Sequence, residues 1–303
     1  MLLTLRPAES GDAELLLRVF EDVYHGGYSA CFGRYGALGP KDVWWIQSEK
    51  EVVVLELNRD PAGLLVLGRD KNRLMAEEIL AEPAVLRQIG AGHALRALAE
   101  RIDAELTRRF KEARQEHLRF RTMERNPLGM LLMTAGRYTV ADTLVVSSLD
   151  LPAAAAGAEP APDVGAVPEG YVVRRAFAGQ DEEAVAQLDE ECLGGRALRH
   201  DLAHHLGGRD ARTFLATRDG YPVGFVLAAA REGVGEWRLG VRETHRRRGV
   251  GTVLARTALA ALGARGTHMV VGTHWAGDAV AEAFGSALGF ATERVYIYGE
   301  RPL

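Results

Sequence analysis

Residues 246–251 read Arg246-Arg247-Arg248-Gly249-Val250-Gly251, between an apolar, strand-like segment ending in Leu239-Gly240-Val241 and a helical pattern from Thr252 to about Leu262. The two glycines remove side chains from a turn that opens a helix. Backbone N–H groups in such a turn can close on an anion, and the N-terminus of a helix favours negative charge. Three arginines directly upstream add positive potential. The stretch therefore predicts a cradle for a pyrophosphate group.

This turn differs from the common nucleotide-binding motifs. Leu254 stands where the dinucleotide fingerprint requires a third glycine, and the Lys-Ser/Thr pair of the Walker motif is absent. A solvated, arginine-rich turn before an amphipathic helix is the alternative interpretation of the same residues. The segments on either side of the turn are therefore needed to interpret it.

The residues after the turn predict a strand, a helix and a closing strand. Residues 267–274 are rich in β-branched side chains, which indicates a strand. Residues 278–288 place Ala281, Phe284 and Leu288 at helical spacing, and the helix ends at Gly289-Phe290. Residues 293–298 form the expected last strand.

This order of elements resembles the GCN5-related N-acetyltransferases, the GNAT family. The family pattern Arg/Gln-x-x-Gly-x-Gly/Ala follows its fourth strand, and Arg246, Gly249 and Gly251 match it. A second family pattern, Asn-x-x-Ala-x-x-Leu-Tyr-x-x-Leu-Gly-Phe, runs here as Asp278, Ala281, Phe284, Gly285, Leu288, Gly289 and Phe290. The resemblance covers residues 170–303. It departs at Asp278, which replaces Asn, and at Gly285, which replaces a Tyr proposed to protonate the departing thiolate.

The resemblance implies that acetyl-CoA is the cosubstrate and that no metal takes part. In the family, the fourth strand carries a bulge and splays from the fifth, so that pantetheine inserts between them and a backbone N–H meets the acyl carbonyl. The residues expected to bind the cofactor in this half are Leu239, Gly240, Val241, Arg246, Arg247, Arg248, Gly249, Val250, Gly251, Thr252 and Asp278.

The sequence also divides into two halves that share the same order of predicted elements. Residues 151–169 are rich in Ala, Pro and Gly and predict a linker. Each half shows a strand, a helix, a hairpin and a glycine loop in that order, and the first-half loop, Arg87 with Gly90 and Gly92, again fits Arg-x-x-Gly-x-Gly. Because Pro127 interrupts its tail, the first half reads as a degenerate copy that either binds CoA or serves as a scaffold.

We therefore expect an α/β (α+β) fold with two tandem GNAT-like domains, each a mixed, mostly antiparallel sheet flanked by helices. Their expected ranges are 1–150 and 170–303. This tandem arrangement is similar to that of the mycothiol synthase type. It predicts a monomeric pseudo-dimer or a weak homodimer.

Composition narrows the class of protein. The 303 residues carry a net charge of −4, which argues against nucleic acid and anionic membranes as partners. No apolar run reaches the length of about eighteen residues expected of a membrane span, and the N-terminus is unlike a signal peptide. Two cysteines, Cys31 and Cys192, exclude a disulfide framework and favour a cytoplasmic location. The adjacent His204 and His205 point apart on a helix, so a metal pair is not expected.

Acyl transfer to an amine needs a base that keeps the amine neutral and an acid for the thiolate. Glu236, on the fourth strand, and His274, at the end of the fifth, are the candidate bases. Strand alternation puts Glu236 on the face opposite Leu239 and Val241 unless the bulge resets it. Tyr296 and Tyr298 are the candidate acids, with solvent as the alternative. For each of these side chains, an exposed or packing role is the competing interpretation.

The predicted function is transfer of an acetyl group from acetyl-CoA to a primary amine of a small molecule or peptide. A CoA-binding regulatory or scaffold protein without turnover is the alternative, because Gly285 removes the usual acid and the first half is degenerate.

Overall fold

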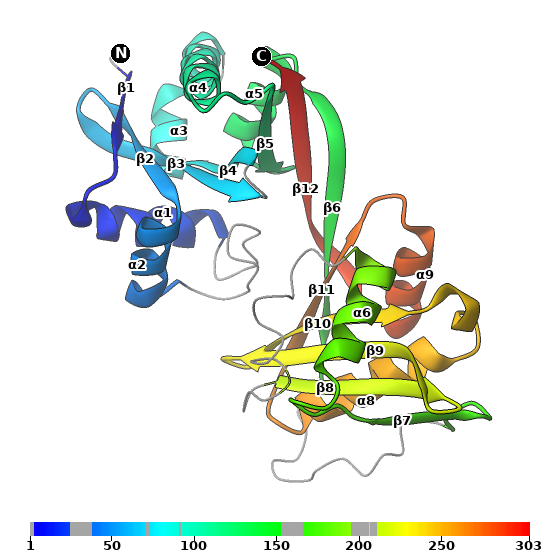
Figure 1. Ribbon diagram of the computed structural model, residues 1–303. Coiled ribbons are helices and arrows are strands. Elements are labelled where there is room, and N and C mark those ends of the chain that lie inside the picture. Colours follow the sequence, from blue (N-terminus) through cyan, green and yellow to red (C-terminus); the bar gives the residue numbers. More distant parts are fainter. Residues whose placement is uncertain are drawn as a thin grey trace. The chain divides into compact units, whose positions relative to one another are not determined.

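The structure, a computed structural model, describes residues 3–24, 38–70, 73–90, 92–152, 166–194, 206 and 211–303 (Figure 1). Its contacts form two compact units. Unit 1 comprises Met1–Val146, Thr273–Leu288 and Thr292–Leu303, and unit 2 comprises Ser147–Gly272 and Gly289–Ala291. Each unit is described by itself.

Unit 1 contains a mostly antiparallel sheet with the strand order β1-β2-β3-β4-β5-β12-β6. The neighbours β4 and β5 are parallel. Its first strands are β1 (Leu3–Pro7), β2 (Glu51–Leu57), β3 (Asp60–Asp70), β4 (Arg73–Ala81) and β5 (His117–Met123). Its helices are η1 (Ser10–Asp12), α1 (Ala13–Tyr24), α2 (Pro40–Glu49), α3 (Pro83–Ile89), α4 (His93–Glu112), α5 (Pro127–Ala135) and α9 (Ala279–Leu288).

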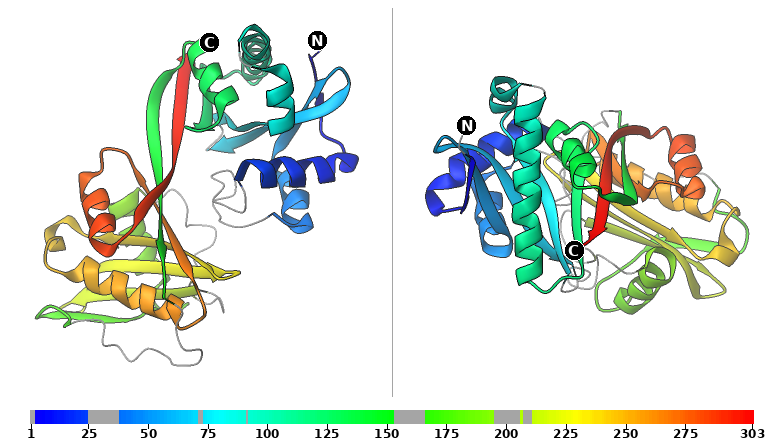
Figure 2. Two further views of the ribbon diagram at one scale, coloured as in Figure 1. Left: turned by 180° about the vertical axis from the view of Figure 1, so that it is seen from behind. Right: turned by 90° about the horizontal axis from the view of Figure 1, so that it is seen from above.

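The core of unit 1 forms because α4 has an apolar stripe at helical spacing. Leu98, Ile102, Leu106 and Phe110 recur every four residues and are all buried, so that one face of the helix packs on the sheet. Figure 2 shows α4 lying along the strands. Phe120 of β5 belongs to the same cluster. α4 begins directly after Gly92, the last residue of the first-half glycine loop.

Unit 2 repeats the plan with the strand order β11-β10-β9-β8-β7, in which only the β10–β11 neighbours are parallel. Its elements are β7 (Tyr171–Arg175), α6 (Glu182–Leu193), β8 (Ala211–Arg218), β9 (Tyr221–Arg231), β10 (Val234–Val241), η2 (Glu243–His245), α8 (Val250–Gly263) and β11 (Met269–Trp275). Val226 and Ala228 of β9 pack with α8, whereas Phe225 and Leu227 pack with α6. Because successive side chains of a strand point to opposite faces, α8 and α6 cover opposite faces of this sheet.

The strands that close the two sheets come from opposite halves of the sequence. The neighbour of β5 is β12 (Ala291–Pro302), paired antiparallel from Tyr296↔Met123 to Pro302↔His117. The neighbour of β11 is β6 (Thr139–Asp150), and the Leu151 N–H donates to the His268 carbonyl at 2.7 Å. The expected domain ranges do not include this exchange, and they stay a prediction. Residues 153–165 of the expected linker lie outside the described residues.

An Arg–Asp ion pair that occurs once in each unit shows that the two units repeat the same plan. In unit 1, Arg6 of β1 donates two hydrogen bonds to the Asp12 carboxylate, at 2.7 and 2.8 Å. In unit 2, Arg174 of β7 does the same to Asp181, at 2.8 and 2.7 Å. Each carboxylate also accepts a backbone N–H, from Glu9 or from Phe177. The expected fold class, with its mixed and mostly antiparallel sheets flanked by helices, is confirmed.

Candidate active site

The loop 246–252 leads from β10 into the first turn of α8. Gly249 is the N-cap residue of α8 and has a left-handed backbone, with φ of 81°. A side chain at this position would be strained, and its Cβ would lie 3.3 Å from Cγ of Pro168. The first helical bond joins the Val253 N–H to the Gly249 carbonyl, at 3.1 Å. The N–H groups of Val250, Gly251 and Thr252 therefore precede the ladder of α8 and point outward from its positive end.

The arginines of this loop are all exposed. Nε of Arg246 donates to the Val241 carbonyl at 2.9 Å, which fixes the loop to the end of β10. Arg247 has a left-handed backbone, with φ of 60°, so the chain turns sharply at this residue. Arg247 and Arg248 place two further positive charges next to the outward-pointing N–H groups. The residues of the predicted anion cradle thus form one continuous segment, and anion binding there stays a prediction.

β10 and β11 are paired for only part of their length. Their parallel register runs from Val234↔Met269 to Glu236↔Val271, while the strands continue to Val241 and Trp275. β10 also pairs with β9 from Val234 to Val241 without a shift. The bulge expected in this strand is therefore absent, and that expectation was wrong for β10. The side-chain alternation is not reset, so Glu236 lies opposite Leu239 and Val241.

The face of β10 that carries Glu236 lies against α6. Nε of Arg238, two residues further along this face, donates to Oδ1 of Asp189 at 2.5 Å, and the Asp189 side chain is only 2% exposed. A Cβ built on Gly240 would lie 2.9 Å from Cβ of Cys192 and 2.7 Å from Cε1 of Phe225. Gly240 therefore allows α6 to approach β10 closely. Burial raises the pKa of the Cys192 thiol.

Sequence reasoning missed the Arg238–Asp189 pair. The available signal was an acid at position 189, directly after Leu188, within the buried stripe of α6. A buried carboxylate needs a cation or several donors, and Arg238 supplies both the charge and a two-pronged contact. The pair fixes β10, which carries the half-buried Glu236, against α6.

Other predicted site residues lie in unit 1, which includes the last three residues of β11. Oδ1 of Asp278 accepts the Ala281 N–H at 3.0 Å, so Asp278 caps α9. Tyr296 is fully buried, and Tyr298 packs edge-on against Trp275 with ring centroids 5.4 Å apart. The Arg121 guanidinium lies 5.9 Å from the Tyr296 ring and 5.8 Å from the Tyr298 ring. His274 is half-buried on β11. The roles assigned to these four residues stay predictions.

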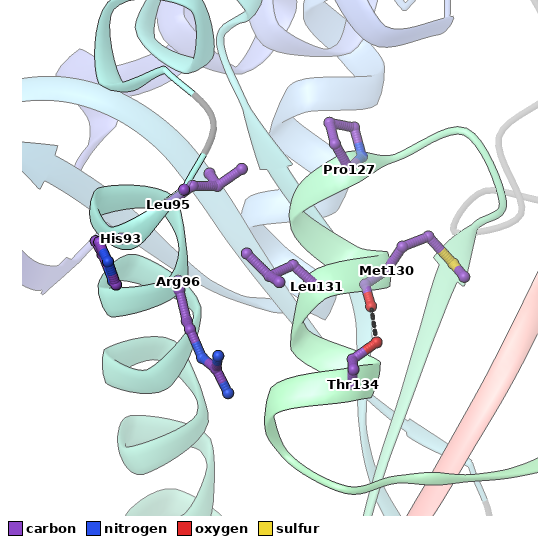
Figure 3. A pocket seen from close by; sticks show the side chains of 8 residues that line it. His93, Leu95, Arg96, Pro127, Met130, Leu131 and Thr134 are labelled. Carbon is purple, nitrogen blue, oxygen red and sulfur yellow. Dashed lines mark hydrogen bonds between the residues drawn. The ribbon is translucent and has the colours of Figure 1, made fainter.

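The first-half loop also opens a helix. Gly90 follows α3 with φ of 71°, Gly92 is the N-cap residue of α4 with φ of 115°, and Arg87 is exposed in the last turn of α3. A pocket of about 580 Å³ begins at Gly92 (Figure 3). It lies between α4 and α5, and its lining is Gly92, His93, Leu95, Arg96, Pro127, Met130, Leu131 and Thr134.

Behind this loop, side chains satisfy the backbone of β4. The parallel register of β4 with β5 is the single pair Ala76↔Phe120, and the β3–β4 register shifts beside Glu77. Nε of Arg121 donates to the Glu77 carbonyl at 3.2 Å. Nδ2 of Asn126, at the start of α5, donates to the Ile79 carbonyl at 2.6 Å. The bulge expected in unit 2 is thus present in unit 1, where side chains bond to the strand carbonyls.

The described residues contain neither a metal-binding cluster nor a membrane-spanning helix. No group of three or more His, Cys, Asp or Glu side chains there is arranged to hold a metal ion. No helix in the described ranges is both long and apolar enough to cross a membrane. His204 and His205 lie outside those ranges.

Comparison with known proteins agrees with the order of elements. Residues 182–290 match the family model "Acetyltransferase (GNAT) family". No curated protein sequence matches the chain. Among solved structures, the chain is similar to a GCN5-related N-acetyltransferase from Sphaerobacter thermophilus, with a TM-score of 0.73, 17% identity, and coverage of 99% of this chain and 95% of that one.

Two further structures share the fold. A tandem GNAT protein from the clavulanic acid biosynthesis pathway has a TM-score of 0.72 and 17% identity, with coverage of 99% of this chain and 98% of that one. A glucosamine N-acetyltransferase region of a fungal multi-domain β-N-acetylglucosaminidase has a TM-score of 0.65 and 14% identity, and covers 99% of this chain and 38% of that one. At these identities the likeness concerns the fold.

Proposed function

We propose that the chain is a GNAT acetyltransferase, as the match of residues 182–290 to that family model supports, and that it transfers an acetyl group from acetyl-CoA to a primary amine at the loop 246–252. The observation that carries this proposal is the glycine-capped start of α8, with Val250, Gly251 and Thr252 presenting N–H groups beside Arg246, Arg247 and Arg248. This arrangement fits a pyrophosphate, because aligned N–H groups and nearby guanidinium groups both stabilise anionic oxygens. No metal is needed for that contact.

The acyl end of the cosubstrate would lie where β10 and β11 are no longer paired, beyond Glu236↔Val271. A thioester supplies an activated acyl group and a thiolate leaving group. The backbone of Leu239, Gly240 and Val241 would orient the acyl group and polarise its carbonyl as negative charge develops on the oxygen.

The amine must lose its extra proton before it attacks. We assign this role to Glu236, acting through water, because it belongs to the same unit as the loop and lies on the α6 face of β10. His274 is the second candidate. The new C–N bond forms as the C–S bond breaks, and the thiolate then takes a proton from solvent. General acid–base groups contribute roughly 10²–10⁴-fold to such reactions, so turnover can persist without the family tyrosine.

The experiment is a titration of acetyl-CoA followed by a thiol-release assay over a panel of small amines. Gly251→Val places a branched side chain at the start of α8. Its matched control is Gly263→Ala at the other end of α8, where a new Cβ would meet only Cδ1 of Leu151, at 3.9 Å. Loss of acetyl-CoA binding in the first variant and retention in the second is the expected result. Equal binding in both folded variants would overturn the proposal.

Binding without turnover is the second candidate function. It is favoured by Gly285 and by the complete burial of Tyr296. The first-half loop, with Arg87, Gly90 and Gly92, is proposed on the same basis to hold CoA without catalysis, since the pocket between α4 and α5 begins at Gly92. Acetyl-CoA binding without thiol release across the amine panel would favour this candidate.

A further inference from the structure

Three segments of unit 2 meet at one side of the arginine loop. Tyr171, at the start of β7, pairs with Arg218, at the end of β8. The Tyr171 hydroxyl lies 3.0 Å from Nδ1 of His245, the last residue of η2, and the two rings are edge-on with centroids 5.8 Å apart. The Arg218 guanidinium lies over the Tyr171 ring, 5.4 Å from its centroid. These contacts hold Tyr171, Arg218 and His245 next to the loop that begins at Arg246.

The charges that act on His245 are those of arginines. Burial, followed by the positive charges of Arg248, Arg218 and Arg242, holds the pKa of His245 below its usual range. Arg242 is itself paired with Glu191, at 3.0 Å, whereas Arg248 is exposed and the Arg218 side chain is 40% exposed. Asp219 lies 3.8 Å from Arg218, but its side chain is 85% exposed and its charge is screened by solvent. The cluster therefore has more cationic than anionic charge.

We propose that Tyr171, Arg218, His245 and Arg248 bind a phosphate monoester on the ligand whose pyrophosphate lies on the loop 246–252. For coenzyme A this group is the 3′-phosphate of the ribose, which dephospho-CoA lacks. This inference rests on the proposed function, because it takes the pyrophosphate position as its starting point.

The donors present suit such a group. A guanidinium offers a fork of N–H groups that matches phosphate oxygens, and Arg218 and Arg248 each present one. The imidazole offers one N–H when neutral and two when charged, whereas a tyrosine hydroxyl both donates and accepts. The Tyr171–His245 hydrogen bond is therefore kept in either state: the hydroxyl donates to the neutral ring and accepts from the charged one.

From this arrangement we expect that binding of the phosphate monoester changes the protonation of His245. A bound phosphate replaces the net positive surroundings of His245 by a negative group, which favours the charged imidazole. Binding of the phosphate monoester thus draws a proton onto His245. The extra affinity that depends on His245 grows as pH falls toward the ordinary histidine range of about 6.5.

The test compares CoA with dephospho-CoA in calorimetric titrations against the wild type, Arg218→Gln and His245→Gln. The wild type is expected to bind CoA about 10- to 100-fold more tightly than dephospho-CoA, as two charge-assisted contacts allow. Each variant is expected to lose most of this ratio while keeping its affinity for dephospho-CoA. Arg231→Gln, at an exposed residue beyond the loop and the cluster, is the matched control and should retain the wild-type ratio.

Repeating the titrations in two buffers of different ionisation enthalpy measures proton uptake. More protons are expected to be taken up with wild type than with His245→Gln, for CoA and not for dephospho-CoA. An equal affinity of the wild type for both ligands, or an unchanged ratio in both variants, would overturn the inference and leave the proposed function standing. Failure of both ligands to bind the folded wild type would instead remove the proposed function. If His245→Gln does not fold, Tyr171→Phe keeps the ring packing and removes the hydrogen bond.

Discussion

In unit 1 the side chains of Arg121 and Asn126 donate to carbonyls of β4, whereas in unit 2 the arginine that donates to a β10 carbonyl does so at the last residue of the strand, Val241. Each sheet has one pair of parallel neighbours at this place, β4 with β5 in unit 1 and β10 with β11 in unit 2. In unit 1, the carbonyls of Glu77 and Ile79 on β4 therefore already have side-chain donors. With the same plan, one half thus has strand carbonyls bonded to side chains, and the other has the proposed anion-binding loop at the end of the strand.

The two glycine loops differ in charge and in backbone. The N-cap residue of α4 is the second glycine of the pattern, Gly92, with φ of 115° and ψ of −139°, whereas that of α8 is the first glycine, Gly249, with φ of 81° and ψ of −8°. Three exposed arginines precede the second helix, whereas one exposed arginine, Arg87, lies in the helix before the first. The place within the pattern at which the helix begins and the number of nearby arginines therefore both distinguish the loop proposed to bind acetyl-CoA from its first-half copy.

The largest effect is expected from replacing Glu236, which tests whether unit 2 carries the catalytic base. Glu236→Gln should lower kcat by roughly 10²–10⁴-fold, because the amine loses its base, while the dissociation constant for acetyl-CoA stays the same. Single-turnover thiol release and calorimetric titration measure the two quantities. Glu232→Gln, in the turn before β10, is the control. A kcat within twofold of the wild type would transfer the role to another group, with His274 next to be tested.

The glycines at equivalent loop positions should differ in importance. Gly251→Val is expected to weaken acetyl-CoA binding by about 10- to 100-fold, the cost of losing one or two charge-assisted hydrogen bonds to the pyrophosphate. Gly92→Val should leave the rate of thiol release unchanged. Binding stoichiometry from the same titration shows whether the first half holds a second, non-reacting molecule. Loss of activity only in Gly92→Val would assign turnover to unit 1.

In unit 1, the side-chain donors that bond to β4 carbonyls are expected to affect the stability of the protein but not its affinity for acetyl-CoA. Asn126→Ala should destabilise the protein by about 1–3 kcal/mol, because the buried Ile79 carbonyl loses its donor and α5 loses its N-cap. Urea unfolding measures the change. The affinity of the loop 246–252 for acetyl-CoA should be unaltered, and a marked change in that affinity would argue that the two halves are coupled.

The smallest expected effect compares the repeated ion pairs. Hydrogen bonds from Arg6 and Arg174 hold the pKa of Asp12 and of Asp181 below the usual range. Each pair therefore adds stability that is fully present above the unfolded-state pKa of about 3.9 and is lost as pH falls through the lower folded value. Asp12→Asn and Asp181→Asn should each cost about 1–2 kcal/mol at pH 7. Their deficit relative to the wild type should shrink below pH 4, and a deficit that persists there would contradict the electrostatic cause.

The local sequence was sufficient to predict the elements of unit 2 around the loop 246–252. The strand ending at Val241, the helix after Gly249 and the strand 269–275 lie where alternation, glycine and helical spacing put them. The face on which Glu236 lies also followed from alternation, once the register of β10 proved to be unshifted. These features depend on neighbours within a few residues, which is the range over which side-chain periodicity acts.

Only the tertiary structure decided which partner each closing strand takes. The segments of β6 and β12 are similar twelve-residue strands that each follow a helix, and nothing in their sequence distinguishes β5 from β11 as a neighbour. Strand pairing is decided by long-range packing, such as the contacts of Arg301 on β12 with Asp103 and Thr107 of α4. For the same reason the sequence predicted the anion loop as one continuous segment, but not the pairs Arg238–Asp189 and Tyr171–His245. Each of those pairs joins residues that only the folded sheet brings together.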